Sequence, residues 1–185
     1  MIEYFAQSHV GLVRKGNEDS YYAPSQSRPK DPQFFLCVAD GLGGHNAGEI
    51  ASQLAVRTMV TSMQTMEGKN QMLDHPFETM QRLFFEANDK IHMLSTESEK
   101  MYGMGTTLTA AVCKKHMVCI AHVGDSRAYL FNEDGLVQIT TDHTFVQTLI
   151  QSGQLTEKAA LTHPYRHVIT RAVGIEQFLE VDFFE

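Results

Sequence analysis

In the stretch Val38-Ala39-Asp40-Gly41-Leu42-Gly43-Gly44-His45, an apolar run gives way abruptly to one carboxylate and then to glycines. The preceding residues, Phe34–Val38, have the length and composition of a buried β-strand. Such a strand holds the Asp40 carboxylate rigidly, and Gly41 lets a backbone carbonyl approach a bound ion without a Cβ in the way. The stretch predicts a metal or phosphate site, although an isolated Asp-Gly pair is more often a turn.

Two further acidic elements follow the same pattern. Arg14 stands four residues before the pair Glu18 and Asp19, with a glycine and an asparagine between them that permit a turn. Asp125 follows the β-like run that ends at Gly124. We therefore expect three strand ends each to deliver an aspartate. Taken alone, Arg14 would more often form a surface ion pair, and Glu18 could be a solvated loop acid.

Six ordered elements of the sequence carry a family resemblance. They resemble the bacterial form of the metal-dependent PPM (type 2C) serine/threonine phosphatases over nearly the whole chain, and six elements in order are far more specific than any one alone. The elements are Arg14-x-x-Asn17-Glu18-Asp19, Asp40-Gly41-Leu42-Gly43-Gly44-His45, Gly105-Thr106-Thr107, Gly124-Asp125-Ser126-Arg127, Thr141-Asp142-His143-Thr144, and His163-Pro164 with Thr170-Arg171-Ala172-Val173-Gly174.

The resemblance implies an α+β fold, a layered α-β-β-α sandwich of two antiparallel sheets flanked by helices. We expect residues 1–185 to form a single phosphatase catalytic domain. The family pattern continues into an Asp-Gly element and a final Asp-Asn element that complete its metal shell. This chain stops at Val181-Asp182-Phe183-Phe184-Glu185, before either of them. The expected domain is therefore C-terminally incomplete, and this chain alone is expected to be weakly active or inactive.

The resemblance also implies a metal site. Asp40 would bridge two divalent ions, the Gly41 carbonyl would be a further ligand, and Asp125 would hold the third ion found in bacterial relatives. Glu18 and Asp19 would ligate the ions directly or orient their bound waters, and the sequence leaves both options open. Hard oxygen ligands without a histidine or cysteine cluster favour Mn²⁺ or Mg²⁺ over zinc.

Arg14 is the candidate phosphate-binding residue, because a guanidinium can pair with two phosphoryl oxygens at once. The predicted activity is hydrolysis of phosphoserine and phosphothreonine in protein substrates, opposing a kinase, with Arg14 and Asp40 as the catalytic residues. Two alternatives remain open. One is a phosphatase-like regulatory module that binds phosphorylated partners without turnover, and the other is a small-molecule phosphohydrolase on the same scaffold.

Composition narrows the setting. The 185 residues carry a formal net charge of −7, which argues against nucleic acid as a partner because phosphate backbones demand a basic face. The three cysteines lie in apolar runs and are an odd number, which favours free thiols in a reducing compartment. The sequence shows neither a signal peptide nor a membrane span, so a cytoplasmic protein is expected.

Periodicity predicts the secondary structure. Asn46–Glu49 resembles a capping box that leads into a helix at Ile50–Met66, with Ile50, Leu54 and Met63 on one face. His45 is interpreted as a residue at this helix entry rather than as an acid catalyst. A second amphipathic helix is predicted from Pro76 to Ser95, and both helices are expected to cover one face of a sheet.

Short β-like runs and a mobile segment follow these helices. Antiparallel strands of one meander are predicted at 106–113, 116–122, 127–131 and 136–140. A helix is predicted at 144–152, ending at Gly153. The resemblance implies that residues 144–165 form a flap beside the active site.

Overall fold

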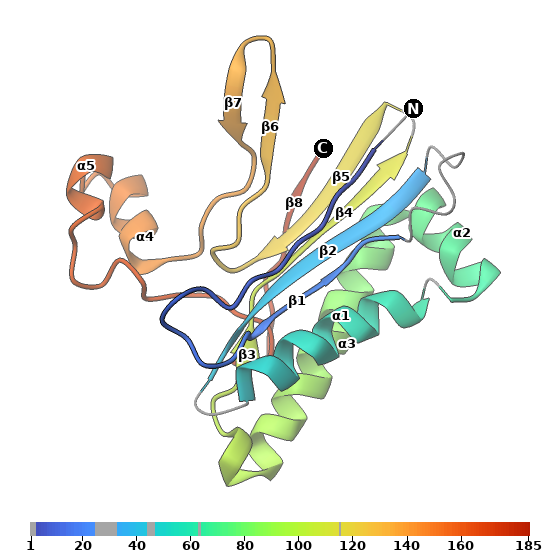
Figure 1. The fold of residues 1–185 in the computed structure, drawn as a ribbon, viewed down its shortest axis with the longest axis horizontal. Helices are drawn as coiled ribbons and strands as arrows, with labels where there is room; N and C mark the ends of the chain where they lie inside the picture. Colours follow the sequence, from blue (N-terminus) through green and yellow to red (C-terminus); the bar gives the residue numbers. More distant parts are fainter. Residues whose placement is uncertain (1–2, 25–32, 44–46, 63, 115) are drawn as a thin grey trace.

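The computed structural model describes residues 3–24, 33–43, 47–62, 64–114 and 116–185. Within these ranges the strands build one six-stranded antiparallel sheet and a separate two-stranded hairpin (Figure 1). The strands are β1 (Asp19–Tyr22), β2 (Gln33–Leu42), β3 (Gly105–Thr106), β4 (Leu108–Lys114), β5 (Met117–Val123), β6 (Tyr129–Asn132), β7 (Gly135–Gln138) and β8 (Asp182–Phe184). The helices are α1 (Ala47–Ser62), α2 (Met66–Asp74), α3 (Pro76–Glu97), α4 (Phe145–Gln151), α5 (Glu157–Ala160) and the 3-10 helix η1 (Glu99–Met101).

Strand β2 organises the large sheet. The strand order is β1-β2-β4-β5-β8, and the short β3 also pairs with β2, beyond the end of β4. Val38 on β2 lies opposite Thr109 on β4, while Gly41 lies opposite Thr106 on β3. Thr107 separates β3 from β4. Because β3 continues the pairing with β2 beyond this break, the end of β2 that carries Asp40 keeps a paired neighbour.

Helix α3 confirms the amphipathic pattern predicted for residues 76–95. Pro76 occupies the first turn, where its missing N–H is tolerated, and the helix runs two residues beyond the predicted end to Glu97. The apolar positions at three- and four-residue spacing are fully buried against the sheet and α1: Met80, Phe84, Ala87 and Ile91.

Helix α1 overlaps the predicted helix but ends at Ser62, four residues before the predicted end at Met66, and it presents a different face. Its wholly buried positions are Ala51, Ser52, Ala55 and Met59, whereas Ile50 and Leu54 are only half-buried. Small residues at four-residue spacing let the helix approach the sheet closely, so the buried stripe is shifted by one position from the expected one. Figure 1 shows α1 and α3 on the same face of the sheet, as expected. The predicted capping residue Asn46, together with His45 and Met63, lies outside the described residues.

Helix α2 was not predicted from the sequence. Its start is capped by Thr65, whose side-chain oxygen accepts a hydrogen bond of 3.0 Å from the Gly68 N–H. Only Gly68, Met72 and Leu73 of its nine residues are buried. A helix this short, with so few apolar positions, carries too weak a period to stand out in the sequence.

The predicted four-stranded meander is wrong in its second half. Strands β4 and β5 pair as expected, but β6 pairs only with β7. The edge of β5 is instead occupied by β8, with Ile120 opposite Phe184. Figure 1 shows the β6-β7 hairpin standing apart from the large sheet. Its turn, at Asp134-Gly135, is the hairpin turn that its sequence indicates.

The segment between residues 144 and 169, called here the α4-α5 segment, extends away from the sheet (Figure 1). Thr144 caps α4 by accepting a hydrogen bond of 3.3 Å from the Gln147 N–H, and Gly153 ends the helix region with a φ of 73°. The two ends of the segment meet in an antiparallel bridge between Thr144 and Ile169. The predicted helix at 144–152 is thus confirmed.

The predicted α+β class with antiparallel sheets and helices is confirmed. The main core lies between the large sheet and the layer of α1 and α3, and residues from both sides are fully buried in it, including Phe35, Leu108 and Phe84. None of the helices in the described ranges is long and apolar enough to cross a membrane.

Candidate active site

Asp19 and Asp40 are brought face to face by the register of β1 and β2, in which they are direct partners. Asp19 opens β1, and its backbone N–H donates to the Asn17 side-chain oxygen at 3.1 Å, which shapes the turn before the strand. Asp40 lies inside β2, two residues before its end, so the strand continues past the predicted boundary. Asp125 lies two residues beyond the end of β5, after Gly124.

The approach of β2 to α1 explains the glycine after Asp40. A Cβ built on Gly41 would lie 2.0 Å from the carbonyl oxygen of Gly48, which no real side chain tolerates. The Gly41 N–H donates to the Glu18 carbonyl oxygen at 3.1 Å. A Cβ on Gly48 would lie 3.0 Å from Oε1 of Glu18, so this carboxylate adjoins the first turn of α1. The resulting arrangement places Glu18, Asp40 and the start of α1 together.

The carboxylates of this site repel one another. Burial, the negative charges of Asp19 and Asp125 and a hydrogen bond with Asp19 raise the pKa of Asp40 to about 6, against a smaller opposing effect of the Arg14 charge. The pKa of Asp125 is also raised, first by burial and then by the charge of Asp142. A cluster of acids held together with this much repulsion fits a divalent cation, which would neutralise it.

In the present geometry, the carboxylates of the described residues do not by themselves complete a site for a metal ion. Among the described residues, no group of three or more His, Cys, Asp or Glu side chains is close enough to hold one metal ion as it stands. Asp19 and Asp40 are direct neighbours, while Asp125 acts on Asp40 over a longer range through its charge. The donors are all oxygen atoms, the type that Mg²⁺ and Mn²⁺ prefer.

Arg14 lies at the rim of the same site. Its Nη1 forms an ion pair of 2.8 Å with Oε2 of Glu18, and its side chain is 75% exposed. Its charge lowers the pKa of Asp40, which shows that the two residues are within electrostatic range. The structure thus brings Arg14, Glu18 and Asp40 together, and the first two are already partners.

Two threonines that received no role from the sequence hold the Asp40 backbone. The Asp40 N–H donates to Oγ1 of Thr107 at 2.8 Å, and the Thr107 N–H donates to the Asp40 carbonyl at 2.9 Å. Thr106 donates its hydroxyl to the same carbonyl at 3.0 Å. The Thr107 hydroxyl also meets that of Ser126 at 2.8 Å, next to Asp125. Thr107 therefore links the Asp40 backbone to the Ser126 side chain, next to Asp125, and only the motif Gly105-Thr106-Thr107 signalled it.

A cleft of about 420 Å³ lies beside β1 and β2 and reaches Asp19, Asp40 and Ser126 at one end. Its walls are partly apolar and include Phe5, Tyr21 and Val38. An open cleft that ends at paired carboxylates can hold a peptide against them.

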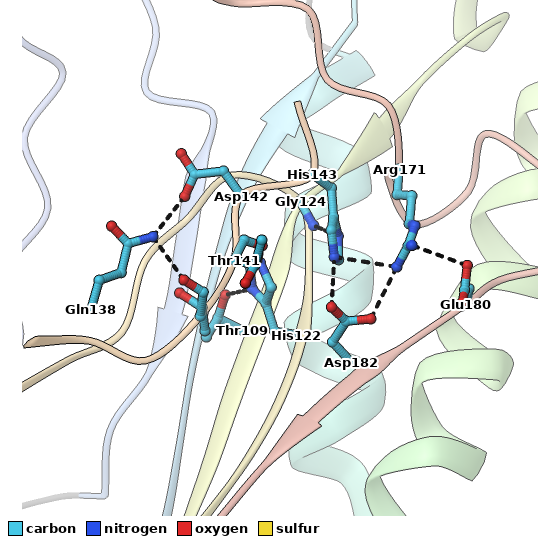
Figure 2. A network of polar contacts seen from close by, with 11 residues as sticks. Thr109, His122, Gly124, Gln138, Thr141, Asp142, His143, Arg171, Glu180 and Asp182 are labelled. Carbon is cyan, nitrogen blue, oxygen red and sulfur yellow. Dashed lines mark hydrogen bonds and ion pairs between the residues drawn. The ribbon is translucent and has the colours of Figure 1, made fainter. Parts of the chain in front are cut away.

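A second polar cluster lies behind the turn that carries Asp125 (Figure 2). His122, which had no predicted partner, is completely buried: its Nε2–H donates to the Thr141 carbonyl and its Nδ1 accepts from Thr109. Burial, with a smaller contribution from His143, lowers the pKa of His122 to about 4. Nearby, Arg127 donates hydrogen bonds from Nε and Nη2 to the Asp142 carboxylate, with distances of 2.6 to 3.0 Å.

Comparison with known proteins identifies the class. The family model for protein phosphatase 2C matches residues 14–173. The serine/threonine phosphatase Stp of Listeria innocua is 38% identical over 94% of this chain and 68% of its own length. The crystal structure of the Mycobacterium tuberculosis phosphatase PstP/Ppp superposes with a TM-score of 0.78 at 37% identity, covering 94% of this chain and 68% of that one.

A further solved structure bears on the metal site. It is the catalytic domain of PstP in complex with two manganese ions, with a TM-score of 0.74, 35% identity, and coverage of 94% of this chain and 68% of that one. The fold and the relatives together define a protein serine/threonine phosphatase. More particularly, the chain belongs to the protein phosphatase 2C family.

Proposed function

We propose that the chain hydrolyses phosphoserine and phosphothreonine in proteins at a site built by Asp40, Gly41, Asp19, Glu18 and Asp125. The observation that carries this proposal is the pairing of Asp19 with Asp40 near the end of β2, with Asp125 close enough for its charge to raise the pKa of Asp40. A protein has little reason to keep such a cluster unless a cation neutralises it.

The residues that would hold Mn²⁺ or Mg²⁺ are Asp40, shared between two ions, with Asp19, Glu18 and the Gly41 carbonyl around it. The manganese ions in the PstP structure support a count of two, and Asp125 is the proposed ligand of a third. When bound, such ions supply a water of lowered pKa and neutralise the phosphoryl oxygens. The Thr107 hydrogen bonds hold the Asp40 backbone in place for this task.

Arg14 would bind the phosphoryl group of the substrate. One of its nitrogens is engaged by Glu18, and a guanidinium carries five N–H donors, so the others can reach phosphoryl oxygens. Its high exposure lets it meet a phosphorylated side chain that arrives from solvent. The Glu18 contact would keep the guanidinium near Asp40 until then.

The substrates in this proposal are phosphorylated proteins, and a protein kinase supplies them. The named relatives are phosphatases, which does not favour the alternative of a regulatory module that binds phosphorylated partners without turnover. The same names speak against a general small-molecule phosphohydrolase.

The test is release of phosphate from a phosphothreonine peptide in the presence of Mn²⁺, together with Mn²⁺ binding measured by electron paramagnetic resonance. Asp40→Asn should abolish release and weaken Mn²⁺ binding at least about tenfold. The matched control is Asp134→Asn, because Asp134 also precedes a glycine but lies in the exposed turn of the β6-β7 hairpin.

Each result has a separate meaning. Loss of release and of Mn²⁺ binding in Asp40→Asn, with Asp134→Asn unchanged, supports the proposal. Binding of Mn²⁺ that is the same in both variants would overturn the assignment of Asp40. Tight binding of the phosphopeptide without release would favour the regulatory module.

A further inference from the structure

His143 occupies a junction that the proposed mechanism does not use. Its side chain is 6% exposed, and both its backbone and its ring are bonded to distant parts of the chain. Figure 2 places its ring between Gly124 and Asp182, with Arg171 beside them.

The first connection is to the turn that carries Asp125. The His143 N–H donates to the Gly124 carbonyl at 2.7 Å, and the Gly124 N–H donates back to the His143 ring nitrogen Nδ1 at 3.0 Å. Gly124 has a φ of +115°, and a Cβ there would lie 2.6 Å from the Thr107 side chain. The turn is thus fixed at both of its peptide groups just before Asp125.

The second connection fixes the orientation of the ring. Because Nδ1 accepts from a backbone N–H, the ring proton resides on Nε2, which donates to Oδ2 of Asp182 at 3.1 Å. Arg171 holds the other oxygen of Asp182 at 3.0 Å. Its Nη1 is also 3.3 Å from Nε2, but two donors face each other there, so that contact is no hydrogen bond. Although burial opposes ionisation, these partners lower the pKa of Asp182, which keeps it a carboxylate.

The third connection is to the α4-α5 segment. The Thr170 N–H donates to the His143 carbonyl at 2.8 Å, and the Phe145 N–H donates to the Val168 carbonyl at 2.9 Å. The two ends of the segment are therefore joined to each other beside His143. We call this junction, made by residues 143–145 and 168–170, the neck of the segment. The charge of His167, which belongs to this segment, partly offsets the rise in the pKa of Asp125, so the segment lies within electrostatic range of this carboxylate.

We propose that His143 is a positioning residue that locks the Gly124-Asp125 turn to the neck of the α4-α5 segment. The turn that carries Asp125 and the segment then keep one relative position, which the ring bond to Gly124 and the backbone bonds of His143 enforce, while the bond to Asp182 orients the ring. His143 itself is too buried to meet a substrate. The proposed effect on catalysis rests on the function proposed above, whereas the lock itself does not.

Two substitutions remove the two ring hydrogen bonds of His143 one at a time. His143→Asn places an oxygen near the Nδ1 position, which can still accept from the Gly124 N–H, but its side chain is too short to reach Asp182. His143→Gln places its amide nitrogen near the Nε2 position, which can still donate to Asp182, but it offers Gly124 no acceptor. His116→Asn, at an exposed histidine, is the control.

Amide hydrogen exchange followed by NMR tests the lock without any activity. In His143→Gln the Gly124 amide should exchange about tenfold faster, as the loss of one hydrogen bond implies, while amides of α3 and β4 remain protected. In His143→Asn and in His116→Asn the Gly124 amide should stay near the parent rate. Equal acceleration in the Asn and Gln variants, or acceleration over the whole chain, would overturn the proposal.

Catalysis gives a second, separable readout. With the phosphothreonine peptide, His143→Gln should raise the Mn²⁺ concentration for half-maximal rate by about tenfold and leave the peptide KM unchanged, since Asp125 acts on the cation. His143→Asn should restore the parent Mn²⁺ dependence. A change in KM alone would overturn the link to Asp125. If the parent chain releases no phosphate, the function proposed above fails, and the exchange rates still decide for or against the lock.

Discussion

Asp19 and Asp40 lie directly opposite each other on β1 and β2, and the Asp19 carboxylate raises the pKa of Asp40. Two facing carboxylates repel each other unless one of them holds a proton or a cation lies between them. The antiparallel pairing therefore forces an acid pair that is either partly protonated or neutralised by a cation.

The substitution Asp40→Asn should stabilise the chain in the absence of divalent cations. The pKa of Asp40 is 3.8 when unperturbed and about 6 in the folded chain. As pH rises from about 4 to about 6, the unfolded state loses this proton first, so folding loses stability. Above this range the penalty is complete. Because Asp40 is exposed and solvent screens the repulsion, we expect a gain of about 1 kcal/mol at pH 7 in the variant.

Urea denaturation in the presence of a chelator, at pH 4 and at pH 7, measures this effect. The variant and the parent chain should differ at pH 7 and converge at pH 4. Addition of Mn²⁺ at pH 7 should stabilise the parent chain more than the variant. A variant that is less stable than its parent at pH 7 without Mn²⁺ would contradict the repulsion among the carboxylates.

Thr107→Val should destabilise the site without changing its shape. The substitution removes the acceptor of the Asp40 N–H and the hydroxyl that meets Ser126, both in a residue that is 1% exposed. A buried N–H without a partner costs about 1–3 kcal/mol. Thr96→Val, at an exposed position of α3, removes a hydroxyl that bonds only its own helix and should cost far less. Thermal unfolding of the two variants distinguishes these expectations, and equal losses would refute the role of Thr107.

Gly41→Ala should be strongly destabilising because its Cβ would lie 2.0 Å from a backbone oxygen of Gly48. Backbone cannot move aside as a flexible side chain can, so we expect a loss of about 3 kcal/mol or more. Gly16→Ala is the matched control, since no atom lies within 4 Å of its Cβ. It should be neutral or slightly stabilising. The midpoint of urea unfolding measures both, and a Gly41 variant as stable as the control would contradict the close approach of β2 and α1.

The sequence predicted those elements whose signal is local. Helix α3 could be predicted from its apolar positions at helical spacing and from the proline in its first turn. Both signals involve residues that are only a few positions apart in the sequence. Helix α1 was found, yet its buried face was placed one residue away. Its contact with the sheet is made by Ala51 and Ala55, and alanine is too common on exposed helix faces to mark a buried one.

Pairings between distant segments could not be predicted in the same way. Strand β8 takes the edge of β5 that the meander pattern would have given to β6, because the chain turns away at Gly124 and three residues near the end pair in its place. The His143 contact with Asp182 spans 39 residues. A sequence pattern names residue types at fixed spacing, whereas this contact depends on how the loop before α4 and the start of β8 are placed in space.

The sequence named the residues of the candidate site but not their partners. The expected carboxylates of Asp19 and Asp40 meet because they are register partners, which no motif states. Arg14 was expected to bind phosphate, and a surface ion pair with no named partner was the competing expectation. The structure shows an ion pair with Glu18, and phosphate binding stays a proposal for the same side chain.

Asn88→Asp should detach the loop that follows Val173 from α3. Asn88 is 1% exposed; its amide nitrogen donates to the carbonyl of Glu176 at 2.9 Å, and its oxygen accepts from the Gly174 N–H at 2.7 Å. A carboxylate keeps the second bond but turns the first into repulsion between two oxygens in a buried place. We expect a loss of about 2–3 kcal/mol.

The control for this change is Asn132→Asp in the β6-β7 hairpin. The exposed Asn132 side chain accepts from the Asp134 N–H at 2.9 Å, a bond that a carboxylate makes equally well. Its stability should stay within about 0.5 kcal/mol of the parent. Amide exchange then locates the damage: in Asn88→Asp the Gly174 amide should lose protection before the amides of β2 and β4. Uniform loss across the sheet would mean that Asn88 supports the whole core rather than the loop. The order in which the amides lose protection therefore decides whether the loop that follows Val173 opens independently of the sheet.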